Sequence, residues 1–166
     1  MRLEEIKSQE TVFIDANIFL YHFGGASCEC KELIKRCETG DIVGVTAITV
    51  LAEICHRLIL AEAIKYAFIS SGKPALQLKK KPQVVKKLSE YYTQIMDIGS
   101  WGIKIIAPPE DIFIKSQVYR SRFGLLTNDS LIPVYMAFAN TAKLATANQG
   151  FMNIPSLEVY LPSDIA

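Results

Sequence analysis

The chain has 166 residues, which is enough for one domain with a substantial core and short for two. Half of the residues are hydrophobic and 21% are charged, which excludes a disordered chain. The net charge of +1 gives no general attraction for nucleic acids or membranes, so such binding would need a local patch. No apolar run reaches the roughly 20 residues that span a bilayer, and residues 1–10 lack the apolar core of a signal peptide. We therefore expect a cytoplasmic protein without a membrane segment.

The first half of the chain alternates predicted strands and helices. The β-branched and aromatic run over 11–15 predicts a buried strand, followed by a turn and a further apolar stretch. Apolar residues at helical spacing predict a helix over 28–37, ended near Gly40. A short apolar run predicts a strand over 42–45, and an apolar helical stripe predicts a long helix from Thr46 to about Ala67.

The second half begins with a stretch rich in turn residues, glycine, proline and lysine, which predicts a loop over 70–82. The elements expected after it are a helix over 83–97, a strand over 103–107, helices starting at 110 and spanning 125–140, and strands over 144–146 and 157–161. Strands separated by helices predict an α/β fold with three layers, α/β/α, around a parallel sheet of about four or five strands. The segment from about 60 to 100 lies between strand units and predicts a helical elaboration.

The four cysteines do not form a recognisable metal or disulfide pattern. Their spacing is C-x-C-x6-C followed by a distant fourth, which differs from the paired C-x2-C of structural zinc sites. We expect reduced thiols with a structural role.

Three acidic residues stand in apolar surroundings. Asp15 ends the first predicted strand, Glu53 lies in the middle of an apolar helix, and Asp129 lies between Leu125-Leu126 and Leu131-Ile132. A buried charge without a partner is costly, so each needs a cation or a donor nearby. Three such acids, far apart in sequence, predict one site for a hard divalent cation.

Each acid also has a purely structural interpretation. Asp15 and Asp129 could each cap a helix, and Pro133 would make a helix begin or kink near Asp129. Glu53 could pair with Arg57, four residues further along a helix. The joint occurrence of the three acids favours the site.

At these acids the chain resembles the PIN-domain ribonucleases, in particular the VapC-like toxins. The matching segments are FIDANIFLY (13–21), TAITVLAEICHRL (46–58), GLLTNDSLIPVYMA (124–137) and LATANQGF (144–151). The resemblance implies a single PIN-like domain over 1–166 that hydrolyses RNA phosphodiesters with Mg²⁺ or Mn²⁺. It also implies a small antitoxin partner and a homodimer.

The resemblance assigns roles to individual residues. Asp15, Glu53 and Asp129 correspond to the metal-binding and catalytic carboxylates, and Asn17 and Thr146 to the polar residues that accompany them.

The chain departs from the family at the fourth acidic position. Asn148 stands where the family commonly has an aspartate, and Gly150 where a second acid often follows. An amide supplies no charge, which lowers the expected metal affinity. A second hypothesis therefore stays open: a catalytically weakened PIN-fold protein that acts as an RNA-binding or interaction module.

A basic run gives one candidate RNA contact. Lys79, Lys80 and Lys81 could follow a phosphate backbone, although a solvated loop is slightly favoured.

Overall fold

The structure is a computed structural model, and it describes residues 1–165. Five parallel strands form one sheet in the order β3-β2-β1-β4-β5. The strands are β1 (Thr11–Ile14), β2 (Val43–Ala47), β3 (Lys104–Ile106), β4 (Lys143–Ala145) and β5 (Glu158–Tyr160). The predicted α/β fold with a parallel sheet is confirmed.

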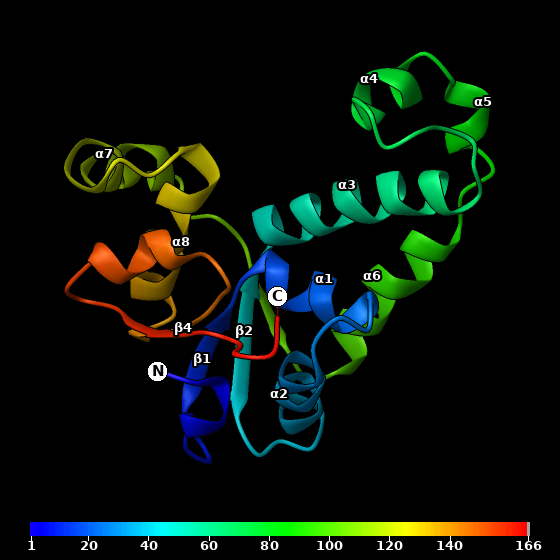
Figure 1. Cartoon of the computed structure of the whole chain (residues 1–166). Coiled ribbons are helices and arrows are strands. Elements are labelled where there is room, and N and C mark those ends of the chain that lie inside the picture. Colours follow the sequence, from blue (N-terminus) through cyan, green and yellow to red (C-terminus); the bar gives the residue numbers. More distant parts are fainter. Residues whose placement is uncertain (166) are drawn as a thin grey trace.

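Helices flank the sheet (Figure 1). The elements before β3 are η1 (Leu3–Glu5), α1 (Ala16–Phe23), α2 (Cys28–Glu38), α3 (Ile48–Lys65), α4 (Pro74–Lys79), α5 (Pro82–Val85) and α6 (Glu90–Ser100). Those after it are α7 (Ile112–Phe123), α8 (Thr127–Phe138) and η2 (Gln149–Asn153). Figure 1 shows α7 and α8 on one side of β1 and β2, with α1, α2 and α6 on the other. Crossovers between parallel strands are right-handed, so the direction in which the chain crosses the sheet determines the face on which its helices lie. The chain moves from β1 through β2 to β3 in one direction and then returns past β1 to β4, which places the two groups of helices on opposite faces.

The segment after β1 was expected to turn, and it instead forms α1. The Asp15 side chain accepts a hydrogen bond from the Ala16 N–H and caps this helix. Ile18 and Phe19 are fully buried, so the apolar stretch packs as a helix face rather than as a loop.

Two expectations for residues 70–100 are wrong. The predicted loop over 70–82 contains α4, and the predicted helix over 83–97 is divided into α5 and α6. Pro74 and Pro82 stand at the first residues of α4 and α5, where a missing N–H costs nothing. The prolines therefore start helices here instead of marking a loop. The expected helical elaboration around 60–100 is present.

The elaboration has a small apolar core of its own. The main core surrounds the sheet, and a second cluster lies between the end of α3 and the helices α4 and α5. Its buried members are Ala63, Ile69, Leu78, Val84 and Leu88. Over residues 1–165, no helix combines the length and the apolar character needed to cross a membrane.

Gly44 in β2 allows close packing between the sheet and α2. A Cβ at this position would lie 2.8 Å from Cys37 Sγ and 3.0 Å from Ile103 Cγ1. We expect Gly44→Ala to lower the free energy of unfolding by about 1–3 kcal/mol, because the added methyl overpacks the core. Urea denaturation would measure the loss. Gly99→Ala is the matched control, since a Cβ there meets no atom within 4 Å and the residue lies in a helix; this variant should be neutral or stabilised.

Candidate functional site

The candidate site lies where the strand order of the sheet reverses. From β1 the chain continues to β2 on one side, and β4 pairs with β1 on the other. Ile14 is in register with Ala145, so the residues that follow them, Asp15 and Thr146, emerge side by side at the carboxyl edge of the sheet. In open parallel sheets this reversal point opens the crevice that binds ligands.

Asp15 is buried there, with 7% of its surface exposed. Its Oδ2 accepts a hydrogen bond of 2.6 Å from the Thr146 hydroxyl, and its Oδ1 accepts one of 2.7 Å from the Ala16 N–H. Burial nevertheless raises the pKa of Asp15 from 3.8 to about 6, because desolvation of the carboxylate outweighs these two hydrogen bonds. The negative charges of Asp129 and Glu53 also raise this pKa. The three predicted acids therefore lie within electrostatic reach of one another.

Asn17 joins the carboxylate to the loop after β4. Its amide nitrogen donates to Asp15 Oδ2 at 2.8 Å and to Thr146 Oγ1 at 3.2 Å, and its carbonyl oxygen accepts the Ala147 N–H at 2.8 Å. The two polar residues assigned by the resemblance thus both contact Asp15, and the network fixes the orientation of its carboxylate.

Asp129 lies in the first turn of α8, and the N-cap interpretation is wrong. The helix begins at Thr127 after Leu126, and it continues through Pro133 instead of starting beside it. The Asp129 carboxylate accepts a hydrogen bond of 3.2 Å from the Asn148 amide. Burial raises the pKa of Asp129, and the Asn148 hydrogen bond opposes that rise.

Glu53 reaches the same place from α3. It lines a small pocket together with Asp129, and it forms no ion pair with Arg57 within residues 1–165. The pairing that would have explained Glu53 structurally is therefore absent from the described part of the chain.

The chemistry of these residues suits a hard divalent cation. All three acids offer carboxylate oxygens, which Mg²⁺ and Mn²⁺ prefer, and within residues 1–165 none of them forms an ion pair with a lysine or arginine. In the described residues, no group of three or more His, Cys, Asp or Glu side chains is arranged to hold a metal ion directly. Because Mg²⁺ usually keeps several of its waters, one or two direct contacts from the protein suffice to hold it.

The basic run lies elsewhere. Lys79 ends α4, and Lys80 and Lys81 connect it to α5 at the end of α3 that is remote from the sheet (Figure 1). Lys81 donates a hydrogen bond of 2.7 Å to the Phe68 carbonyl, which gives it a structural partner. The structure therefore separates these lysines from the acids that the sequence suggested they might accompany.

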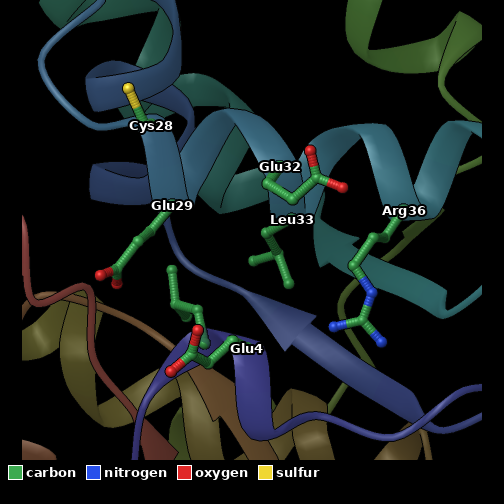
Figure 2. Close-up of a pocket in the computed structure, with 7 residues that line it drawn as sticks. Glu4, Cys28, Glu29, Glu32, Leu33 and Arg36 are labelled. Atoms are coloured by element: carbon green, nitrogen blue, oxygen red, sulfur yellow. The ribbon is translucent and has the colours of Figure 1, made fainter.

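A second cavity, of about 230 Å³, lies between η1 and α2 (Figure 2). Leu3 and Leu33 contribute buried apolar side chains to its lining, and Glu4 and Glu29 contribute acidic ones. None of the three acids of the candidate site lines this cavity, so it does not extend that site.

One supporting residue could not be found from the sequence. Arg120 of α7 donates hydrogen bonds of 2.7 Å and 2.8 Å to the hydroxyls of Ser116 and Ser130. Ser130 follows Asp129 directly, so Arg120 fixes the turn of α8 that carries this acid. Its sequence context is that of an ordinary solvated arginine in a helix, and no motif singles it out.

Comparisons with known proteins identify the fold class. No protein-family model and no curated protein match the sequence. Solved structures do match, and they show that the chain has a PIN-like fold.

Two of these structures contain toxin–antitoxin proteins. One is VapBC2 from Rickettsia felis bound to a DNA fragment from its promoter: identity is 17%, the match covers 92% of this chain and 99% of that chain, and the TM-score is 0.58. The other is a toxin–antitoxin complex from Klebsiella pneumoniae, with 19% identity, coverage of 93% and 99%, and a TM-score of 0.55.

Proposed function

We propose that the protein is a divalent-metal-dependent endoribonuclease and the toxin of a toxin–antitoxin pair. The observation that carries the proposal is the convergence of Asp15, Glu53 and Asp129 at the reversal point of the sheet, with Asp15 buried and fixed by Thr146 and Asn17. The toxin–antitoxin origin of the structural neighbours supports the same assignment.

In this proposal the residues of the site have different roles. A bound Mg²⁺ or Mn²⁺ would orient the phosphate and lower the pKa of a water. Asp15 and Asp129 would hold the ion, and Glu53, which like Asp129 is partly exposed, would complete the negative charge around it. Thr146 and Asn17 donate to Asp15 Oδ2 and the Ala16 N–H donates to Oδ1, so a lone pair of Oδ1 would remain for the ion.

RNA cleavage tests the proposal directly. We expect the protein to cut single-stranded RNA with Mn²⁺ or Mg²⁺, and to lose this activity when a chelator is added. Asp15→Asn and Asp129→Asn should each lower the rate at least tenfold, because each removes a charged ligand of a hard cation. Asp97→Asn is the control, since it makes the same chemical change at an exposed helix residue. Equal activity in all three variants would contradict the proposed site.

The proposed partners are a small antitoxin and a second copy of the chain. Large apolar side chains on α7 and α8, Phe113, Ile114 and Phe138, are exposed, as is Leu126 between the two helices. The two helices pack against each other, and large exposed apolar side chains on such a pair are typical of a protein–protein contact. Light scattering after size exclusion, with the protein alone and co-expressed with the product of an adjacent small gene, would give both masses.

Asn148 supports the second candidate function, a weakened PIN-fold protein that binds RNA or a partner. RNA retention without cleavage under any divalent ion would favour it over the nuclease.

A further inference from the structure

Asn148 contacts both sides of the candidate site through different atoms. Its main-chain N–H donates to Thr146 Oγ1 at 3.0 Å, and that hydroxyl in turn donates to Asp15. Its side-chain amide nitrogen donates to Asp129 Oδ2 at 3.2 Å. One residue thus connects Asp15 at the end of β1 with Asp129 on α8.

The orientation of the Asn148 amide is fixed by its second polar atom. The carbonyl Oδ1 accepts the Gly150 N–H at 2.9 Å at the start of η2. Turning the amide over to present its oxygen to the acids would break this hydrogen bond and the one to Asp129 together. The side chain therefore presents N–H, a donor, toward the acids, and N–H groups repel a cation.

We propose that Asn148 is a positioning residue and not a metal ligand. It holds the Asp129 carboxylate beside the Asp15 network by donating a hydrogen bond, and it occupies the position of a fourth acid with a group that excludes a second cation. The presence of a metal ion rests on the proposed function. If a second cation is excluded, the site holds one divalent ion per chain.

Exchange of the two side chains tests the hydrogen bond without any metal. In chelator, Asn148→Asp places two carboxylates about 3 Å apart in place of a donor and an acceptor. We expect it to lower the melting temperature by roughly 3–6 °C. Adding Asp129→Asn to this variant should recover most of the loss, because an amide then faces a carboxylate again with the roles reversed. Asn153→Asp is the control: it adds the same charge to η2 at an exposed residue and should cost little.

The chelator experiment can overturn the assignment by itself. An Asn148→Asp melting temperature equal to that of Asn153→Asp would show that Asn148 and Asp129 are not coupled. A loss that Asp129→Asn fails to recover would show that the loss does not come from the contact between Asn148 and Asp129, and it would contradict the positioning role.

Calorimetric titration with Mn²⁺ tests the consequence for the metal. We expect one Mn²⁺ per wild-type chain and two per Asn148→Asp chain. Two ions on the wild type would overturn the exclusion of a second cation. No Mn²⁺ binding by any variant would contradict the proposed nuclease and the single-ion consequence, while the chelator experiment still decides whether Asn148 positions Asp129.

Discussion

Asp15→Asn should gain stability relative to the wild type as the pH rises from 4 to 7 in the absence of metal. Burial raises the pKa of Asp15 from 3.8 to about 6. Between these values the folded wild type keeps a proton that the unfolded chain has released, so its stability falls with rising pH. The amide in the variant does not titrate. The free energy of unfolding of the variant, relative to that of the wild type, should therefore rise by about 2 kcal/mol over this range.

Urea denaturation of both proteins in chelator at pH 4 and pH 7 would measure the shift. Comparing the two pH values removes the constant cost of the substitution, since an amide cannot accept all of the hydrogen bonds that reach the Asp15 carboxylate. Saturating Mn²⁺ should stabilise the wild type at pH 7 and leave Asp15→Asn nearly unchanged. A difference between the proteins that is constant with pH would show that the pKa of Asp15 is not raised in the folded state. An equal Mn²⁺ effect on both proteins would show that Asp15 is not a ligand.

Glu62→Ala should produce the largest loss of stability of the substitutions considered. The Glu62 carboxylate on α3 is buried and accepts the main-chain N–H groups of Ser89, Glu90 and Tyr91, which begin α6. Its removal leaves three donors without a partner at the positive end of a helix. We expect unfolding to become easier by about 3–5 kcal/mol.

Two further variants separate the contribution of charge from that of the hydrogen bonds. Glu62→Gln retains one acceptor oxygen and should lose about 1–2 kcal/mol. Glu90→Gln makes the same change in an exposed side chain that pairs with Lys65, and it should leave the urea midpoint nearly unchanged. A midpoint for Glu62→Ala close to that of the wild type would show that water replaces the carboxylate at the start of α6.

The sequence was sufficient for the elements that bury an apolar face. The strands over 11–15 and 42–45 and the helix over 28–37 were located to within a residue or two, because alternating or helical apolar spacing reflects the packing that stabilises them. The elaboration was harder to predict, since α4 and α5 are short and depend on contacts with α3. The division between α5 and α6 depends on Glu62, which is remote in sequence and looks like an ordinary helix glutamate.

The candidate site shows the same limit. Asp15, Glu53 and Asp129 could be selected because acids in apolar surroundings are unusual, and the structure brings them near one another. The direction in which the Asn148 amide points could not be predicted, because it is fixed by Gly150 and Asp129 together. The remoteness of Lys79 from the acids likewise follows from the length of α3, which carries the basic run away from the sheet.

The pairing of β4 with β1 also determines when the site can form during folding. The hydrogen bond between Thr146 and Asp15 joins residues that are 131 positions apart. Contacts of such long range form slowly, because most of the chain must be ordered before they can close. On the ribosome, β1, β2 and α3 emerge long before β4, so Asp15 and Glu53 stay hydrated and separated from Asp129 and Thr146 while synthesis continues. The acids can therefore come together only in the late stages of folding, and an incomplete nascent chain carries no assembled site.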